Sequence, residues 1–262
     1  KESSVCTIMW VDRKRPTPEM VEKAWDRNDD GGGLAWREPA QKGEGIEVVW
    51  RKGIEDVKDM QKLIKELPMP FVAHFRVASS GGVKPALTHP FPVDKNTSSG
   101  LGGRTKGNVL FHNGDWKSWD EAARQAAIHS NTPIPTGAWS DSRAIAWLCS
   151  IYGPGFMNFL PEQKGVLFGP KLVDFYLGRD GWREVNDVWC SNDYFLTRVK
   201  TYGGFGGYGT VQRFCRFGTC TEDEHLDAEG YCKLHKGGKV QSFEKVESGG
   251  TSDRPPFPTV LQ

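Results

Sequence analysis

The sequence lacks three features that would place it in a specialised class of protein. No run of about 18 apolar residues occurs in its 262 residues, so we expect no membrane-spanning helix. The 34 Lys and Arg residues nearly balance the 33 Asp and Glu residues, and the net charge of +1 is not that of a nucleic-acid-binding protein. Six cysteines are too few for a disulfide scaffold in a chain of this length, which indicates a reducing, cytoplasmic compartment.

The composition that remains is that of a folded chain with one sizeable core. Hydrophobic residues make up 37% of the sequence and charged residues 26%. Short β-branched or aromatic runs predict strands over residues 5–11, 34–36, 46–50, 71–77 and 109–111. Helical patterns predict helices over residues 18–28, 54–66, 119–130 and 140–152, with Ser118 and Ser140 as N-caps. Strands and helices that mix without a strict alternation predict an α+β fold.

The chain divides near residue 200, where its composition changes. Residues 201–212 open with Thr-Tyr-Gly-Gly-Phe-Gly-Gly-Tyr-Gly, which is too rich in glycine for a regular element and predicts a linker. Residues 213–237 contain a Cys/His cluster, and the polar residues 238–262 predict a mobile tail. We therefore expect a main domain over residues 6–200 and a small module after it.

The Cys/His cluster has the spacing of a structural zinc site. Cys215 and Cys220 are separated by four residues, and Cys232 and His235 follow with two residues between them. Three thiolates and one imidazole match the tetrahedral coordination of zinc, and close pairs at each end of a short loop can meet at one point. The alternative is a set of unrelated buried thiols, which a segment with few large apolar side chains does not favour.

Several short motifs in the first 150 residues carry candidate catalytic groups. They are Cys6, the turn Asn-Asp-Asp-Gly-Gly-Gly at 28–33, His-Phe-Arg-Val-Ala-Ser at 74–79, Thr-His-Pro-Phe at 88–91, His-Asn-Gly at 112–114 and Ser-Asp-Ser at 140–142. Each has an ordinary structural explanation when taken alone. Asn-Gly is a common hairpin turn, glycines supply positive φ, and a single cysteine is more often a small core residue than a nucleophile. Their joint order is the informative feature.

In this order the motifs resemble those of class II glutamine amidotransferases, which belong to the N-terminal-nucleophile hydrolases. The resemblance spans residues 6–150 and implies an αββα sandwich, in which two antiparallel sheets face each other between layers of helices. It also implies a role for each matching residue. Cys6 would be the nucleophile, Asn113 and Gly114 the oxyanion hole, Arg76 and Asp141 the groups that bind the α-carboxylate and α-ammonium of glutamine, and Ser79 and His89 further substrate-binding positions.

The chemistry of this set is coherent without the family. A cysteine at the start of a chain has its own α-amine beside the thiol, and a pKa of about 7.7–8.0 suits that amine to proton transfer near neutrality. Two features depart from the family's pattern: Thr7 stands where glycine is usual, and residues 1–5 precede Cys6. We expect residues 1–5 to be a propeptide, which the Cys6 thiol cuts off through an N-to-S acyl shift.

The sequence thus predicts an enzyme that hydrolyses glutamine and releases ammonia for an acceptor. Residues 201–262 leave no room for an acceptor-activating domain, so we expect a separate synthetase or other protein partner. Solitary domains of this family occur in phages, which points to the cytoplasm of an infected host. The alternative is a catalytically silent relative that serves as a binding or structural component, such as a virion-associated protein. The retained motifs argue for the enzyme, and the blocked nitrogen of Cys6 argues for the alternative.

Overall fold

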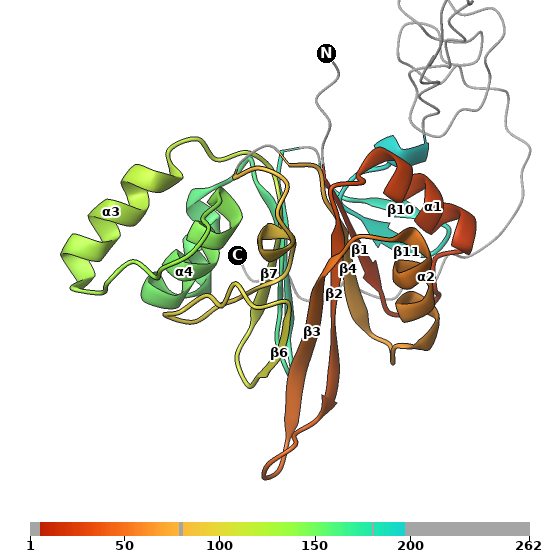
Figure 1. The fold of residues 1–262 in the computed structure, drawn as a ribbon, viewed down its shortest axis with the longest axis horizontal. Helices are drawn as coiled ribbons and strands as arrows, with labels where there is room; N and C mark the ends of the chain where they lie inside the picture. Colours follow the sequence, from red (N-terminus) through yellow and green to blue (C-terminus); the bar gives the residue numbers. More distant parts are fainter. Residues whose placement is uncertain (1–5, 79–80, 180, 197–262) are drawn as a thin grey trace, which may run out of the picture. The chain divides into compact units, whose positions relative to one another are not determined.

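The computed structural model describes residues 6–78, 81–179 and 181–196 (Figure 1). These residues form an α+β fold with two antiparallel sheets, one of seven strands and one of four, which confirms the predicted fold class. No helix in these ranges combines the length and the apolar character needed to cross a membrane. The predicted propeptide, linker, zinc module and tail lie outside the described residues.

The seven-stranded sheet is built around the N-terminal strand. Its order is β10-β11-β1-β4-β2-β3-β6. The strands are β1 Thr7–Val11, β2 Gly32–Pro39, β3 Ile46–Ile54, β4 Phe71–Phe75, β6 Gly102–Thr105, β10 Arg183–Val185 and β11 Val188–Cys190. All five residues of β4, which lies between β1 and β2, are buried, so this strand is covered on both faces of the sheet.

The four-stranded sheet has the order β5-β7-β8-β9. Its strands are β5 Phe91–Pro92, β7 Val109–Asn113, β8 Lys164–Phe168 and β9 Val173–Leu177. Every residue of β7 is buried, because side chains on one face meet the larger sheet and those on the other meet α4. The last residue of β7 is Asn113, so the candidate oxyanion-hole residue stands at a strand end, where the sequence placed it.

Four α-helices lie among the described residues: α1 Pro18–Arg27, α2 Val57–Glu66, α3 Trp119–Ser130 and α4 Asp141–Tyr152. Short 3-10 helices cover Pro85–Leu87, Pro154–Phe159 and Tyr194–Leu196. Ser140 caps α4 as predicted, because its hydroxyl accepts from the Arg143 N–H at 3.3 Å. The prediction for Ser118 is wrong. Its backbone lacks the extended conformation of a capping residue, and its side chain makes no capping hydrogen bond.

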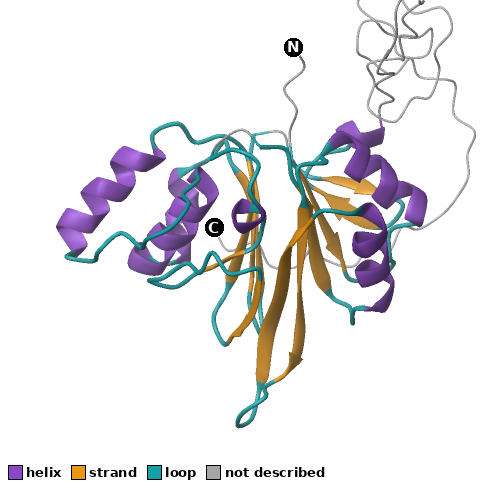
Figure 2. Ribbon diagram, in the orientation of Figure 1, coloured by secondary structure: helices purple, strands orange, loops and turns teal. Residues whose placement is uncertain are grey.

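Figures 1 and 2 show helices on the outer faces of the two sheets. Three of the four apolar clusters among the described residues join the sheets to each other and to these helices. The first packs α1 and α2 against the larger sheet, with Met20 and Met60 facing Phe71 and its neighbours. The second lies between the two sheets, where Ile8 and Val72 of the larger sheet share a core with Phe111 of the smaller one. The third cluster packs α4 against the outer face of the smaller sheet. Burying a large apolar side chain contributes about 1.5–3 kcal/mol, so these clusters account for the association of the sheets and helices.

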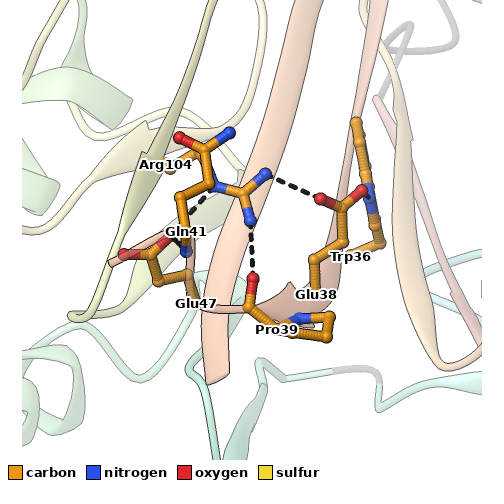
Figure 3. A network of polar contacts seen from close by, with 6 residues as sticks. All are labelled: Trp36, Glu38, Pro39, Gln41, Glu47 and Arg104. Carbon is orange, nitrogen blue, oxygen red and sulfur yellow. Dashed lines mark hydrogen bonds and ion pairs between the residues drawn. The ribbon is translucent and has the colours of Figure 1, made fainter. Parts of the chain in front are cut away.

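The edge strand β6 is held by a polar network and has no buried side chain of its own (Figure 3). The Arg104 guanidinium donates to the Glu38 carboxylate at 2.6 Å, to Glu47 at 2.9 Å and to the carbonyl of Pro39 at 2.9 Å. The Trp36 indole donates to the other oxygen of Glu38 at 2.6 Å. These bonds lower the pKa of both carboxyl groups, so the network keeps its charge at neutral pH and fixes β6 to the β2–β3 hairpin.

Candidate active site

The pairing of β1 with β4 places Cys6 beside Arg76 and Val77. Thr7 lies opposite Phe75 in this antiparallel pair, so the residue before Thr7 meets the residues that follow Phe75. The Cys6 thiol donates to the Val77 carbonyl at 3.3 Å and accepts from the Val77 N–H at 3.3 Å. The Asn192 side chain donates to the Cys6 carbonyl at 2.7 Å. Cys6 is therefore held on both its side-chain and backbone atoms.

The glycine-rich turn before β2 fixes the segment that carries Arg76. The Arg76 N–H donates to the Gly31 carbonyl at 2.9 Å, the Asp30 N–H donates to the Arg76 carbonyl at 3.1 Å, and the Asp30 carboxylate accepts from the Ala78 N–H at 2.7 Å. Gly31 has φ +104°, a conformation that favours glycine. A Cβ at Gly33 would overlap the carbonyl of His89. Backbone conformation at Gly31 and lack of space at Gly33 therefore explain why these two positions are glycine.

Arg76 itself is buried, with 4% of its surface exposed. Its guanidinium donates to the Gly82 carbonyl at 2.9 Å. Arg76 follows β4 at the end where Cys6 precedes β1, and its positive charge lowers the pKa of the Cys6 thiol. A planar guanidinium can bind a carboxylate through two parallel hydrogen bonds, so this position suits the recognition of a carboxylate near Cys6.

Asp141 begins α4 and is also buried. Its carboxylate accepts from the N–H groups of Trp116 at 3.2 Å and Ser142 at 2.8 Å. The N-terminus of a helix stabilises a negative charge, which explains how a carboxylate is tolerated in this buried place. The negative charge of Asp141 raises the pKa of the Cys6 thiol.

Asn113 is linked to the nucleophile strand through Ser191. The Asn113 amide nitrogen and the Ser191 hydroxyl are 2.8 Å apart, and that hydroxyl accepts from the Ile8 N–H at 2.9 Å. The neighbouring Gly114 lies under the Gln163 side chain, and a Cβ there would overlap the Gln163 amide. Asn113 is therefore connected, through Ser191, to the residue two positions along β1 from Cys6.

His112 connects the predicted site residues on β7 and α4. One ring nitrogen lies 2.9 Å from the Ser142 hydroxyl and the other lies 2.9 Å from the Gln163 amide oxygen. The backbone carbonyl of His112 lies 3.2 Å from the His74 ring. The segment that carries Asn113 and Gly114 is thus tied to the start of α4, which carries Asp141.

His89 packs against other rings. Its ring centroid lies 3.9 Å from that of His74 and 5.2 Å from that of Phe91. Neither ring nitrogen has a hydrogen-bond partner among the described residues. Burial lowers the pKa of His89 well below its ordinary value and lowers that of His74 to about 3, so both rings are neutral at physiological pH.

Burial raises the pKa of the Cys6 thiol to about 11. Hydrogen bonding to Val77 and the charge of Arg76 act in the opposite direction but do not overcome the loss of water. Because the thiolate is the nucleophilic form, Cys6 in this environment needs a base to take its proton. The low pKa values of the His74 and His89 rings make both imidazoles weak bases.

Two groups of predicted site residues lie outside the described residues: Ser79, and the zinc ligands Cys215, Cys220, Cys232 and His235. Within the described ranges, no three His, Cys, Asp or Glu side chains are grouped so as to hold a metal ion. Cys149 and Cys190 are buried core residues, and burial raises both thiol pKa values.

The sequence reasoning missed three polar residues that hold the candidate site together: Gln163, Ser191 and Asn192. No motif marks them, since each is a single polar residue at the beginning or end of a strand that was not predicted. Comparison of the chain with protein-family models gives no matching family, and a search of curated proteins gives no significant match. The functional argument therefore depends on the residues themselves.

Proposed function

We propose that this chain is a glutaminase of the class II glutamine amidotransferase type, with the four-layer αββα arrangement of the N-terminal-nucleophile hydrolases. One observation carries the proposal. Cys6 and Arg76 lie at one end of the paired strands β1 and β4, Asn113 is linked to β1 through Ser191, and the charges of Arg76 and Asp141 both act on the Cys6 thiol, which supports a shared site for these four residues. Two packed antiparallel sheets between pairs of helices support the same assignment.

In the proposed reaction the Cys6 sulfur attacks the side-chain carboxamide carbon of glutamine. The α-amine of Cys6 takes the thiol proton, and the Asn113 amide and the Gly114 N–H stabilise the oxyanion. The carbon–nitrogen bond then breaks, and the α-amine passes its proton to the departing ammonia. Water hydrolyses the resulting thioester, which gives glutamate and restores the thiol. Arg76 and Asp141 bind the α-carboxylate and α-ammonium of the substrate, and Ser79 and His89 complete its surroundings.

This scheme requires a free α-amine on Cys6. While Val5 is attached, the nitrogen of Cys6 is an amide with no basic lone pair, and a thiol with a pKa of about 11 stays protonated at pH 7. We therefore propose that residues 1–5 are removed before the enzyme acts. The zinc module at residues 213–237 and a separate synthetase that uses the ammonia belong to the same proposal, as does its location in the cytoplasm of a phage-infected host.

A second candidate is a catalytically silent protein that uses the same fold for binding. The observation that favours it is the buried, protonated thiol of a Cys6 that is blocked on its nitrogen.

Ammonia release from glutamine separates the two candidates. The test protein carries a removable leader that leaves Cys6 as the first residue, and its controls are the same protein with Cys6→Ala and the chain that retains residues 1–5. The proposal predicts ammonia and glutamate in equal amounts from the first protein and none from the Cys6→Ala control. A folded protein that begins at Cys6 and releases no ammonia would support the silent alternative.

A further inference from the structure

Ser191 joins the nucleophile strand to the candidate oxyanion hole. It follows directly after β11 and is completely buried. Its N–H donates to the Ile8 carbonyl at 2.9 Å, and its hydroxyl accepts from the Ile8 N–H at 2.9 Å. The same hydroxyl lies 2.8 Å from the Asn113 side-chain nitrogen. One side chain therefore contacts both β1, two residues after Cys6, and the last residue of β7.

The hydrogen bonds around this hydroxyl identify the orientation of the Asn113 amide. A serine hydroxyl has one proton to donate and two lone pairs. With the amide nitrogen of Asn113 toward Ser191, the hydroxyl proton has no acceptor among the described residues, and the buried Asn113 amide oxygen has no partner there. Exchanging the nitrogen and oxygen of the amide lets the hydroxyl donate to the amide oxygen, so that both of these buried groups gain a partner.

The exchanged orientation also changes what Asn113 can do. The Ile8 N–H still donates to the Ser191 hydroxyl, and no hydrogen bond of the described residues is lost. The amide N–H₂ group then occupies the place of the unpartnered oxygen and offers a donor in the buried site. A donor fixed in advance is what stabilises an oxyanion in the transition state.

We propose that Ser191 is a positioning residue, whose hydroxyl holds the Asn113 amide with its N–H₂ group toward the reacting carbonyl oxygen of the substrate. This inference rests on the proposed glutaminase function. Ser191 touches neither the substrate nor the sulfur in this scheme and acts through Asn113. Because it is anchored to Ile8, it also keeps the oxyanion donor at a fixed distance from the strand that carries Cys6.

The test is a double-mutant cycle in protein that begins at Cys6. Ser191→Ala should lower kcat about 10- to 100-fold with the KM for glutamine changed less than two-fold, since losing an oxyanion donor outright costs about 10²–10³. Asn113→Ala should lower kcat by at least as much. In the Asn113→Ala background, Ser191→Ala should have no further effect on kcat, because residues that act through one group are not additive.

The affinity for the inhibitor glutamate γ-semialdehyde distinguishes a positioning role of Ser191 from a purely structural one, because a structural role would leave this affinity unchanged. This aldehyde forms a thiohemiacetal with a cysteine thiol, so its affinity depends on the oxyanion hole, whereas the affinity of glutamate does not. Ser191→Ala should weaken the binding of the aldehyde by the same factor by which it lowers kcat. It should leave the affinity for glutamate unchanged. Ser150→Ala is the matched control, because its hydroxyl donates to the Trp147 carbonyl within α4.

If Ser191→Ala fails to fold, Ser191→Cys tests the same hydrogen bond with a smaller change in the side chain. A thiol nearly preserves the volume of the side chain and makes weaker hydrogen bonds, so kcat should fall while the thermal unfolding midpoint changes little. If Ser191→Ala lowers kcat by the same factor in the wild-type and Asn113→Ala backgrounds, the positioning role is overturned and the proposed glutaminase function still stands. A wild-type chain that begins at Cys6 and is inactive would overturn the proposed function and this role together.

Discussion

Lys52 carries a buried charge whose cost can be measured as a function of pH. It lies in the middle of β3 with 2% of its surface exposed, and its ammonium group stands 4.1 Å from the centre of the Phe91 ring. This group has no hydrogen-bond partner among the described residues. Burial, and to a smaller extent the charge of Arg143, lowers the pKa of Lys52 to about 7.

The pKa shift fixes the sign and size of the effect on stability. The folded protein releases the Lys52 proton near pH 7, whereas the unfolded chain keeps it up to about pH 10.5. The unfolded state thus binds more protons between these values, so the free energy of unfolding rises with pH across this window. The cost is fully present below about pH 7. The difference between a pKa of 10.5 in the unfolded chain and about 7 in the folded protein corresponds to about 5 kcal/mol of lost stability, of which about 2–3 kcal/mol should be regained between pH 6 and pH 9.

Lys52→Met tests this reasoning, because methionine has a similar length and no charge. We expect the variant to be more stable than the wild type at pH 6, and the difference to shrink by about 2–3 kcal/mol by pH 9. The measurement is urea unfolding at four pH values, in which other titrating groups cancel between the two proteins. Lys58→Met, on the exposed face of α2, is the matched control and should show no such trend. A difference between Lys52→Met and wild type that stays constant with pH would refute the buried-charge account.

The remaining predictions concern the proposed chemistry and the metal. Mass spectrometry during incubation should show loss of residues 1–5 from the wild type and their retention in Cys6→Ala; retention in both would contradict self-cleavage. Arg76→Ala and Asp141→Ala should each raise the KM for glutamine by an amount equivalent to about 2–5 kcal/mol, because a substrate charge loses its partner, and an unchanged KM in steady-state assays would refute the assignment. Metal analysis should give about one zinc per chain, lost when Cys215 and Cys232 are both replaced by serine.

The elements that the sequence predicted are those whose residues repeat a simple pattern. The β-branched and aromatic runs of β1, β2, β3, β4 and β7 and the four α-helices are confirmed, with ends that differ by several residues in places. The strand β6, with the sequence Gly-Gly-Arg-Thr, has no such pattern and forms because Arg104 bonds the β2–β3 hairpin. Strands that depend on contacts far along the chain, such as β11 beside β1, carry too little local signal to be recognised.

The candidate site shows the same division between local and distant information. The order of the motifs was enough to propose Cys6, Arg76, Asn113 and Asp141. The structure places Cys6 and Arg76 at one end of the paired strands β1 and β4 and links Asn113 to β1 through Ser191. The register of β1 against β4, which brings Cys6 beside Val77, could not be predicted from local sequence patterns. The sequence also gives no sign of Ser191, because a single buried hydroxyl is significant only once its two partners are known.

The surroundings of the Cys6 thiol decide which base can activate it. The sulfur is enclosed by the Val77 backbone, and burial outweighs the favourable charge of Arg76, so the thiol holds its proton more tightly than a free cysteine does. The His74 and His89 rings are the wrong groups for the task, because burial keeps them neutral and far less basic than a free imidazole. An α-amine on Cys6 itself would lie within one residue of the sulfur and would be supplied by breaking a single peptide bond. If the proposed function holds, release of that nitrogen by cleavage before Cys6 is the step that would supply the base that the buried thiol needs.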